Sequence, residues 1–452
     1  LETFKFVACK MKAHVRASRV ALVLRRQRRG VERARAEPAR PRRSAPSRAA
    51  GHVRSSAREE AVTGSADEGA EEGPSPAGTP TAAKAPSESS AAAKSWALIQ
   101  KWGERVIRMQ ANETGALGRA KKVAVFGGGS FGTAMAVLLA RNKPTLEVVL
   151  LLRDEELCHT INTEHRNTRY LSKWELPERV RATTDPAEAV EGAQYIIHAV
   201  PVQHSSAFLA GIKDVIPPTT PMLSLSKGLE VGTCKMMSEV IPDALGREQP
   251  LAVLSGPSFA VELMEGLPTA IVAASEDEEL AQEVQELFAS SCLRVNTSTD
   301  VAGVEMAGAL KNVLAIAAGI VEGLELGNNA MAAVVAQGCA EIRWLAEKMG
   351  AKPATLGGLS GVGDVMLTCF VNLSRNRTVG VRLGSGETIE EILASSTQVA
   401  EGVATAGAVV ELAETQKVYL PVLTAVARII EGRITPRDAV ESIMRLPQVP
   451  EV

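Results

Sequence analysis

The sequence predicts an α/β protein in which a parallel sheet, wound with crossover helices, is followed by an all-α region. Two observations support this fold class. Between Lys121 and residue 300, short β-branched runs alternate with helical patterns, as expected of parallel strands joined by helices. After Asp300 the β-branched runs end, and apolar residues recur at helical spacing towards the end of the chain. The length of 452 residues allows two or three domains with hydrophobic cores.

Residues 1–95 are expected to be a disordered transit peptide and linker. The segment begins rich in Arg, Ala and Ser and continues as a linker of Pro, Gly, Ser and Ala, which lacks the apolar residues needed to fold. An Arg-rich, acid-poor start is typical of an organelle transit peptide, and a basic tail that binds polyanions is the alternative. We expect the plastid (chloroplast) stroma, with the mitochondrion or the cytoplasm as alternatives. Because the chain begins with Leu1, we also expect its natural start to lie upstream.

Charge and cysteine usage exclude several classes of partner. Residues 1–58 hold 17 of the 50 Lys and Arg residues but only 3 of the 52 Asp and Glu residues, so the remainder is acidic. We therefore expect no nucleic-acid partner for the body of the chain. The six cysteines include no CxxC pair, which argues against a metal site or a disulfide framework and favours a reducing compartment. We predict no membrane span, because the longest uncharged apolar run, residues 123–140, contains four glycines.

The predicted elements divide the rest of the chain into three parts. Residues 96–120 are predicted to contain a lead-in helix, because their apolar residues recur at helical spacing. In residues 121–300 the predicted strands are KVAVFG, EVVLLLR, QYIIHAVP, MLSLS, LAVLSGP, TAIVAAS and LRVNTST. In residues 301–452 only helices are predicted, the first being VAGVEMAGALKNVLAIAAGIVEGLEL.

A glycine motif marks residues 121–300 as a Rossmann-like dinucleotide-binding domain. Gly127-x-Gly129-x-x-Gly132 follows the first predicted strand and opens a helix. The first glycine makes the turn, the second lets the backbone approach a pyrophosphate, and the third lets the helix pack closely. The second strand ends in Arg153-Asp154. Since an acid here binds the ribose diol of NAD and an arginine binds the 2′-phosphate of NADP, the choice of cofactor stays open.

Two further loops follow predicted strands, where open α/β sheets bind ligands. Lys227 lies in SLSKGLE, and its positive charge is expected to attract a phosphate or carboxylate. Gly256, Ser258 and Ala260 lie in LSGPSFAVE, which equally suits an ordinary strand-end loop. Another run, FVNLSRNRTVG, places Ser374 to Thr378 side by side, all able to donate hydrogen bonds, and no acid lies between Asp364 and Glu387.

Lys311 is the strongest candidate for a catalytic group. It lies in an otherwise apolar helix, with the small residues Ala307 and Gly308 one turn earlier. Burial lowers the pKa of a lysine, and an ammonium group beside a cleared space can donate a proton to a carbonyl oxygen as hydride arrives at carbon. The alternative is a lysine that extends from the helix edge into solvent. Asp364 could bind a substrate hydroxyl, pair with Lys311, or cap a helix.

Together these motifs resemble the glycerol-3-phosphate dehydrogenases, which reduce dihydroxyacetone phosphate with a nicotinamide cofactor. The matching motifs are GGGSFGTA, SKGLE, SGPSFAVE, ALKNVLAIAAGI, GVGDVMLTC, SRNRTVG and VAEGVATA. They span roughly three quarters of the chain, are highly specific as a set, and are more similar to the bacterial-type and plastid branch than to the animal cytosolic one. The family commonly has GAG where this chain has Gly127-Gly128-Gly129, and the added glycine should be harmless.

The resemblance implies an oxidoreductase that interconverts dihydroxyacetone phosphate and sn-glycerol 3-phosphate with NAD, or with NADP, and supplies glycerol 3-phosphate for glycerolipid synthesis. Lys311 would be the proton donor and acceptor, with Lys227 and Asp364 beside it. The implied cofactor contacts are Gly127, Gly129, Ser130, Phe131, Gly132, Arg153, Ala260, Arg375, Val399 and Glu401. The implied substrate contacts are Lys227, Gly256, Ser258, Asp364, Ser374, Arg375 and Asn376. No metal is implied, and we expect a homodimer.

Two other functions remain as alternatives. One is another two-domain dehydrogenase that acts on a hydroxy acid, against which the phosphate-suited SRNR run argues. The other is a non-catalytic dinucleotide sensor, which would have no need of a buried proton donor such as Lys311.

Overall fold

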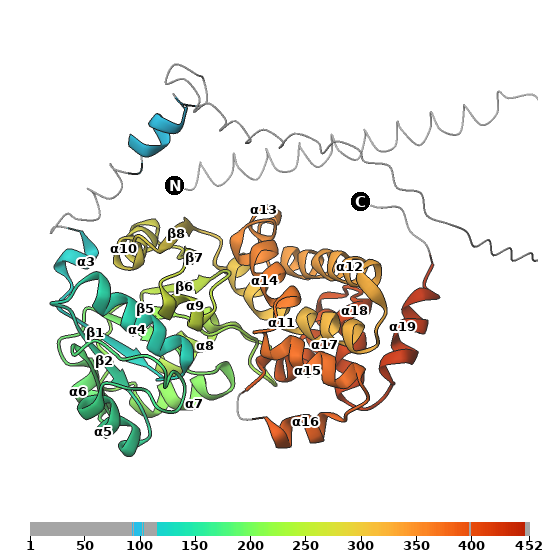
Figure 1. Cartoon of the computed structure of the whole chain (residues 1–452), viewed down its shortest axis with the longest axis horizontal. Coiled ribbons are helices and arrows are strands. Elements are labelled where there is room, and N and C mark those ends of the chain that lie inside the picture. Colours follow the sequence, from blue (N-terminus) through green and yellow to red (C-terminus); the bar gives the residue numbers. More distant parts are fainter. Residues whose placement is uncertain (1–92, 94, 102, 104–114, 397–398, 448–452) are drawn as a thin grey trace, which may run out of the picture. The chain divides into compact units, whose positions relative to one another are not determined.

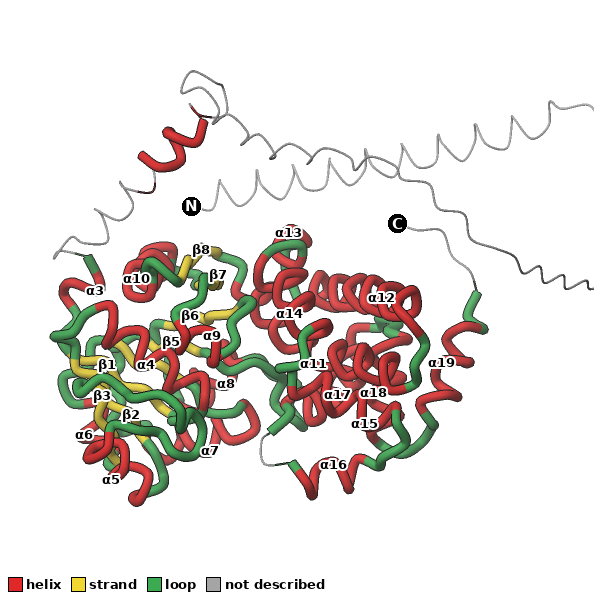
Figure 2. Tube along the Cα trace, in the orientation of Figure 1, coloured by secondary structure: helices red, strands yellow, loops and turns green. Residues whose placement is uncertain are grey.

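The computed structural model describes residues 93, 95–101, 103, 115–396 and 399–447. Eight strands form one sheet (Figures 1 and 2). They are β1 (Lys122–Phe126), β2 (Glu147–Leu151), β3 (Val180–Thr183), β4 (Tyr195–His198), β5 (Met222–Ser224), β6 (Leu251–Ser255), β7 (Thr269–Ala274) and β8 (Leu293–Ser298).

The strand order is β3-β2-β1-β4-β5-β6-β7-β8. All neighbouring pairs are parallel except β6 and β7, which are antiparallel. The expected α/β class is confirmed, but the expectation of a purely parallel sheet was wrong at this pair, because the connection after β6 brings β7 back in the opposite direction. Strand β3 was not predicted at all.

The sheet is buried on both faces, which explains why its strands read as continuous apolar runs. Val123 and Val125 of β1 belong to a core on one face, while Ala124 and Phe126 belong to a separate core on the other. Helices cover these faces and connect the strands. They are α3 (Ala116–Arg119), α4 (Ser130–Asn142), α5 (Glu155–Glu164), α6 (Pro186–Val190), α7 (Val202–Ile212), α8 (Met237–Leu245), α9 (Ala260–Glu265) and α10 (Glu278–Phe288).

After β8 the described chain is helical, as Figure 2 shows. The elements are α11 (Val301–Gly323), α12 (Gly327–Lys348), α13 (Pro353–Leu356), a π-helical turn η1 (Leu359–Gly363), α14 (Asp364–Phe370), α15 (Arg375–Gly384), α16 (Ile389–Ser395), α17 (Glu401–Gln416), α18 (Pro421–Ile430) and α19 (Pro436–Met444). The last strand therefore ends at Ser298 and the first of these helices begins at Val301, on either side of the expected boundary at residue 300.

Helix α11 lies at the centre of the helical region. It is long and apolar enough to span a membrane, yet its most apolar stretch is 94% buried within the protein, as in a core helix of a globular domain. Helix α15 packs unusually close to it. A methyl group on Gly319 would lie 2.1 Å from the backbone oxygen of Arg377, and one on Gly380 would lie 2.1 Å from that of Ile316. These glycines therefore bring the SRNR run next to the helix that carries Lys311.

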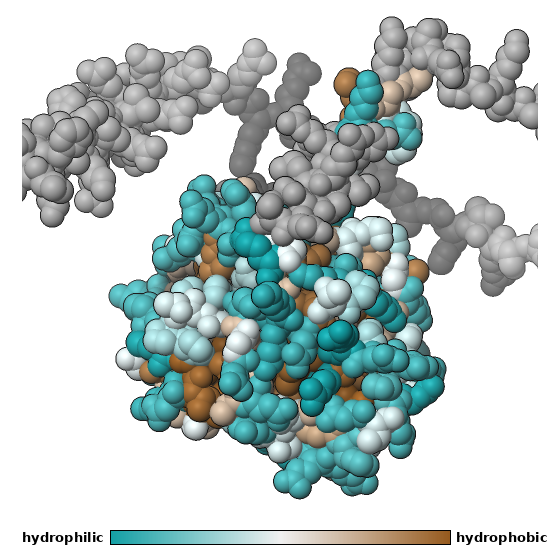
Figure 3. Space-filling view, turned by 90° about the vertical axis from the view of Figure 1, so that its left-hand side faces the viewer, coloured by the Kyte–Doolittle hydropathy of each residue, from teal (hydrophilic) through white to brown (hydrophobic). Residues whose placement is uncertain are grey.

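The lead-in helix expected in residues 96–120 is only partly covered by the described residues. Residues 95–101 are helical, with Trp96 and Ile99 exposed, and α3 follows at Ala116–Arg119. Residues 104–114, and nearly all of the segment expected to be transit peptide and linker, lie outside the described residues. The face of the molecule in Figure 3 is mainly hydrophilic, with separate hydrophobic patches.

Candidate active site

The glycine loop between β1 and α4 has the geometry of a pyrophosphate site. Gly127 has φ +98°, and a methyl group there would lie 2.8 Å from the backbone oxygen of Ala199. A methyl group on Gly132 would lie 2.2 Å from the oxygen of Gly127, so neither position tolerates a side chain without a shift. Gly129 caps α4 without a side-chain hydrogen bond, and nothing lies within 4 Å of where its Cβ would be. The positive end of α4 is thus open to an anion, and the loop fits a dinucleotide.

Lys227, Lys311 and Asp364 form a buried cluster. The Lys311 ammonium donates to Asp364 Oδ1 at 2.6 Å, and the Lys227 ammonium donates to Asp364 Oδ2 at 2.8 Å. The side chains of Lys227, Lys311 and Asp364 are 17%, 8% and 1% exposed. Asp364 is the first residue of α14, whose N-cap is Gly363, so the capping alternative is not what the structure shows. One carboxylate is therefore shared by two lysines.

Burial and neighbouring charges shift the pKa values of Lys311 and Asp364. Burial lowers the pKa of Lys311 to about 8, although Asp364 acts in the opposite direction and Lys227 adds to the lowering. Burial would raise the pKa of Asp364, but the charges of Lys227 and Lys311 outweigh it and hold that pKa below its usual value. An ammonium group with a pKa near neutrality can both give and take a proton, as general acid–base catalysis requires.

Helix α11 approaches the strand ends closely where Gly308 lies. A methyl group there would meet Ser255 Oγ at 2.8 Å and Lys227 Cγ at 3.5 Å. The small residue expected to clear a space beside Lys311 thus makes room for Lys227. A cavity of about 10 Å³ beside Lys227, Ser255 and Glu305 is about the size that holds one water molecule.

The loop after β6 joins the cluster. The backbone oxygen of Gly256 accepts hydrogen bonds from the Lys227 ammonium at 3.2 Å and from Ser258 Oγ at 3.0 Å. Gly256 has φ +136°, and a methyl group on it would lie 2.9 Å from Ile271 Cα, so the tight turn requires glycine. Ala260 begins α9 immediately afterwards.

The SRNR run forms the start of α15, and its side chains have different partners. Ser374 caps the helix, its hydroxyl accepting from the backbone N–H of Arg377 at 3.3 Å. Asn376 Oδ1 accepts from the N–H of Gly402 at 3.0 Å, which ties α15 to α17. Arg377 pairs with Glu322, whereas Arg375 is exposed and has no hydrogen bond or ion pair to any residue that the structure describes. Of the two arginines, Arg375 is the one available to a ligand.

Glu401, the first residue of α17, lies in the electrostatic field of the same groups. Burial raises its pKa to about 7, while the charges of Arg375, Lys227 and Lys311 lower it. Val399 is 57% exposed, two residues before it. Hydrogen bonds thus join residues of four predicted motifs, Lys227, Gly256, Lys311 and Asp364, and Glu401 lies within the electrostatic influence of Lys227.

Arg153 and Asp154 lie beyond the end of β2 and have separate environments. Asp154 Oδ1 accepts from the N–H of Leu157 and so caps α5 at 3.0 Å, and Oδ2 pairs with Arg169 Nη1 at 3.2 Å. Arg153 is exposed and forms no hydrogen bond or ion pair within the described part of the chain.

Two residues that the sequence did not single out hold the site together. Thr368 Oγ1 accepts from the Lys311 ammonium at 2.9 Å and donates to the backbone oxygen of Asp364 at 2.6 Å. Its place four residues after Asp364 was the available signal, since i,i+4 residues share a helix face. The buried Asn167 donates to the oxygen of Gly128 and to Thr133 Oγ1, both at 2.9 Å. It fixes the loop after α5 to the glycine loop, a contact that no local pattern predicts.

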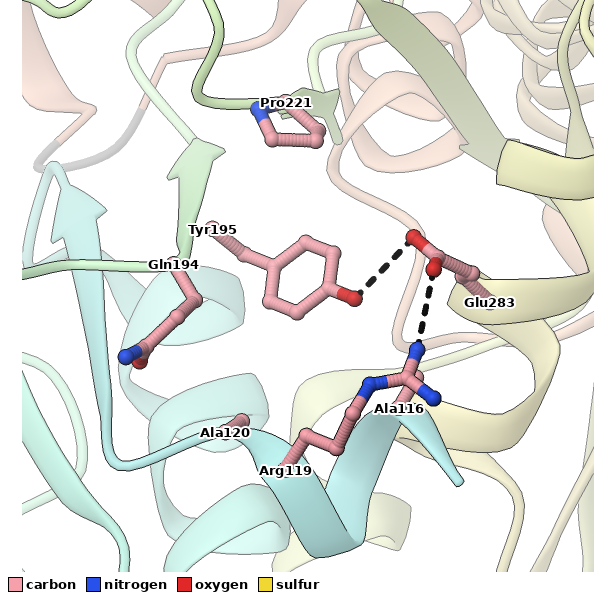
Figure 4. A pocket seen from close by; sticks show the side chains of 7 residues that line it. All are labelled: Ala116, Arg119, Ala120, Gln194, Tyr195, Pro221 and Glu283. Atoms are coloured by element: carbon pink, nitrogen blue, oxygen red, sulfur yellow. Dashed lines mark hydrogen bonds and ion pairs between the residues drawn. The ribbon is translucent and has the colours of Figure 1, made fainter. Parts of the chain in front are cut away.

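A larger cavity, of about 180 Å³, lies at the amino ends of the strands, away from the glycine loop (Figure 4). Its lining residues include Gln194 and Pro221, which precede β4 and β5, whereas the glycine loop follows β1. Tyr195 donates to Glu283 at 3.2 Å, and Arg119 pairs with the same carboxylate at 3.0 Å. No candidate site residue lines it.

No cluster of His, Cys, Asp and Glu suited to a metal ion occurs among the described residues. The five described cysteines are free thiols, and Cys9 lies outside the described part of the chain.

Comparison with known proteins assigns two long stretches of the chain to one family. Residues 122–281 match the model of the NAD-dependent glycerol-3-phosphate dehydrogenase N-terminus, and residues 300–441 match that of its C-terminus. A protein of Arabidopsis thaliana named chloroplastic glycerol-3-phosphate dehydrogenase [NAD(+)] 2 is 62% identical over 79% of this chain and 85% of its own length. The chain belongs to the NAD-dependent glycerol-3-phosphate dehydrogenase family.

Other members of the glycerol-3-phosphate dehydrogenase family agree with this assignment. The chloroplastic enzyme of rice, Oryza sativa subsp. japonica, named for NAD(+), is 60% identical over 79% of this chain and 81% of its own. A bacterial member from Oleidesulfovibrio alaskensis, named for NAD(P)+, is 45% identical over 72% of this chain and 98% of its own. The solved glycerol-3-phosphate dehydrogenase of Coxiella burnetii superposes with a TM-score of 0.69 at 35% identity, over 72% of this chain and 99% of that one.

These relatives confirm three predictions made from the sequence: the family, the Rossmann-like domain followed by a helical region, and the bacterial-type and plastid branch. The chloroplastic names of the two plant relatives also confirm the expected plastid location.

Proposed function

We propose that Lys311 is the proton donor and acceptor in the interconversion of dihydroxyacetone phosphate and sn-glycerol 3-phosphate, the reaction of the family to which the chain belongs. The observation that supports this proposal is that Lys311 and Lys227 both donate a hydrogen bond to Asp364. This cluster is buried at the carboxyl ends of the strands, where the glycine loop also lies. A substrate beside Lys311 is therefore within reach of a dinucleotide.

When bound, the nicotinamide cofactor supplies or accepts the hydride. During reduction, the Lys311 ammonium donates a hydrogen bond to the ketone oxygen and gives up a proton as negative charge develops there. During oxidation, the neutral Lys311 amine accepts the hydroxyl proton of glycerol 3-phosphate. Asp364 and Thr368 keep the amine in place in both directions, and Lys227 adds positive charge beside the developing oxyanion.

The substrate phosphate is assigned to the SRNR run. Arg375 is exposed and lacks a protein partner among the described residues, so its guanidinium fork is available for two phosphate oxygens. Ser374 and Asn376 flank it, and each keeps a hydrogen-bond donor beyond the contacts described above. Gly256 and Ser258 complete the proposed substrate pocket beside Lys227.

The dinucleotide is assigned to the glycine loop and the residues around it. Gly127, Gly129 and Gly132 shape the pyrophosphate cradle, and Ser130 and Phe131 begin the helix that faces it. The further proposed contacts are Arg153, Ala260, Arg375, Val399 and Glu401. We also propose that residues 121–300 and 301–452 act as dinucleotide and substrate domains, that the protein is a homodimer, and that its product supplies glycerolipid synthesis.

The proposed reaction is tested by mixing the purified protein with NADH and dihydroxyacetone phosphate and following the loss of NADH absorbance. We expect turnover with this ketone and little with a 2-keto acid of similar size. Turnover of the keto acid in preference would favour a hydroxy-acid dehydrogenase instead. Binding of NADH without turnover of either compound would favour a dinucleotide sensor.

A further inference from the structure

The acid at the ribose end of the dinucleotide site is already engaged by the protein. Both oxygens of Asp154 have partners, because Oδ1 caps α5 through Leu157 and Oδ2 pairs with Arg169. An acid that accepts the two ribose hydroxyls of NAD needs free lone pairs for them. Each oxygen of Asp154 keeps a further lone pair for a ribose hydroxyl, while Arg169 offsets the negative charge of the carboxylate.

The position of Arg169 is built into the fold. Arg169 follows Asn167, which is fully buried and donates to the backbone oxygen of Gly128 in the glycine loop. The N–H of Tyr170 in turn donates to Asn167 Oδ1 at 3.2 Å. The backbone on both sides of Arg169 is thus fixed to the loop that would hold the pyrophosphate, and its guanidinium reaches back to the end of β2.

One arginine beside Asp154 is available to an additional anion. Arg153 is exposed and unpaired within the described part of the chain, and Arg169 offsets the charge of Asp154. Glu155 and Glu156, in the first turn of α5, add two negative charges nearby, so the state of Asp154 matters for an incoming anion. Without Arg169, the free carboxylate of Asp154 would repel a phosphate on the ribose 2′-oxygen, since like charges brought together in a binding site weaken binding.

We propose that Arg169 is a specificity-determining residue: by holding the carboxylate of Asp154, it lets the site accept a dinucleotide with a 2′-phosphate as well as one without. This inference rests on the proposed binding of the dinucleotide at the glycine loop. Arg153 then meets the 2′-phosphate, while Arg169 acts through Asp154. The site therefore uses both NADH and NADPH.

The test measures binding of two cofactor fragments, ADP-ribose and 2′-phospho-ADP-ribose, to the whole chain by calorimetry at low salt. Arg169→Gln should weaken binding of the 2′-phosphorylated fragment by about ten-fold. Binding of ADP-ribose should change by less than about three-fold, because that fragment places no charge next to Asp154. The side chains of Arg169 and Asp154 are 62% and 42% exposed, so screening keeps the effect moderate.

A second experiment repeats the measurement in the Asp154→Asn background. Asparagine still caps a helix but carries no charge, so adding Arg169→Gln to it should weaken binding of the 2′-phosphorylated fragment by less than about three-fold. Arg181→Gln is the matched control, since it removes another exposed arginine that pairs with an acid, Glu147, in the same domain. Circular dichroism and thermal melting of each variant establish that α5 stays folded.

Three results would overturn the inference: equal losses for both fragments, no loss for either, or a loss that persists undiminished in the double variant. The first two would leave Arg169 without a role in specificity, and the third would place it directly on the phosphate. Failure of the wild-type chain to bind either fragment would instead contradict the proposed dinucleotide site. The ratio of kcat/KM for NADPH to that for NADH should fall in parallel with fragment binding.

Discussion

The Nζ atom of Lys311 lies 2.6 Å from Oδ1 of Asp364, and both side chains are almost completely buried. The pair joins α11 to α14, so the proton donor proposed for the reaction is fixed by a residue more than fifty positions away in the sequence. Because the same carboxylate also holds Lys227, removing it would leave two buried ammonium groups without their common counter-ion.

Asp364→Asn should therefore impair catalysis more than dinucleotide binding. The neutral amide cannot balance the two lysines, and breaking a buried ion pair on one side costs about 3–5 kcal/mol. We expect the pKa of Lys311 to fall further, so that less of it is protonated at neutral pH and kcat for reduction drops. Calorimetry with NADH serves as the control for an intact cofactor site. An unchanged kcat would show that Asp364 does not tune the proton donor.

The two directions of the reaction should respond oppositely to pH. Burial lowers the pKa of Lys311 to about 8, and reduction needs the protonated form, so its kcat/KM should be level below about pH 8 and fall above it. Oxidation of glycerol 3-phosphate needs the neutral amine, so its rate should rise through the same range. Profiles measured in both directions between pH 6 and 10 check this. Parallel profiles would be incompatible with one lysine serving both steps.

The close packing of α15 on α11 should be sensitive to a single methyl group. Gly380→Ala would place Cβ 2.1 Å from the backbone oxygen of Ile316, forcing the helices apart at a cost of roughly 1–3 kcal/mol. We expect a lower Tm and reduced activity, because α15 carries the SRNR run.

Gly407→Ala is the matched control for this packing. Gly407 also lies in a helix, α17, but nothing lies within 4 Å of where its Cβ would be. Because alanine is the better helix former, this change should leave stability equal or raise it by up to about 1 kcal/mol. Equal losses of Tm in the two variants would show that the α11–α15 contact is not the cause.

Arg375→Lys should distinguish a phosphate contact from a structural role. Lysine keeps the charge but loses the fork, and losing one hydrogen bond to a charged group weakens substrate use by roughly ten- to a hundred-fold. The loss should fall on dihydroxyacetone phosphate and much less on unphosphorylated dihydroxyacetone. The measurement is kcat/KM for both ketones. Equal losses on the two would assign Arg375 to the cofactor or the fold.

Arg377→Lys provides the contrast. Arg377 already pairs with Glu322 and donates to Asn372, so its side chain is committed within the protein. We expect any loss from this change to appear in Tm and to affect both ketones alike.

Local sequence patterns predicted much of the fold and part of the candidate site. β-branched runs marked seven of the eight strands, but β3, with the sequence VRAT and an exposed Arg181, is too short and polar to stand out. The antiparallel direction of β7 depends on the path of the chain between β6 and β7. No short run of residues in the sequence indicates that path. Lys311 was recognisable because a lysine is rare in an apolar helix.

Contacts between distant segments were much harder to foresee. The pairing of Lys311 with Asp364 was one of several alternatives, and the simultaneous pairing with Lys227 was not anticipated. The engagement of Asp154 by Arg169 depends on the path of the loop after α5, which buried Asn167 fixes to the glycine loop. Sequence alone placed Arg153 and Asp154 side by side without showing that only one of them is free.

The most direct test of the central claim is the rate of Lys311→Met. Methionine nearly preserves the side-chain volume but has no proton to donate, and general acid–base catalysis is typically worth about 10²–10⁴-fold. Lys348→Met, in which an exposed lysine of α12 is changed in the same way, is the control. We predict that Lys311→Met retains NADH binding and Tm while kcat with dihydroxyacetone phosphate falls at least about a hundred-fold. Retention of more than about a tenth of the wild-type rate would contradict the account and move the proton donor to another group, with Lys227 the next candidate.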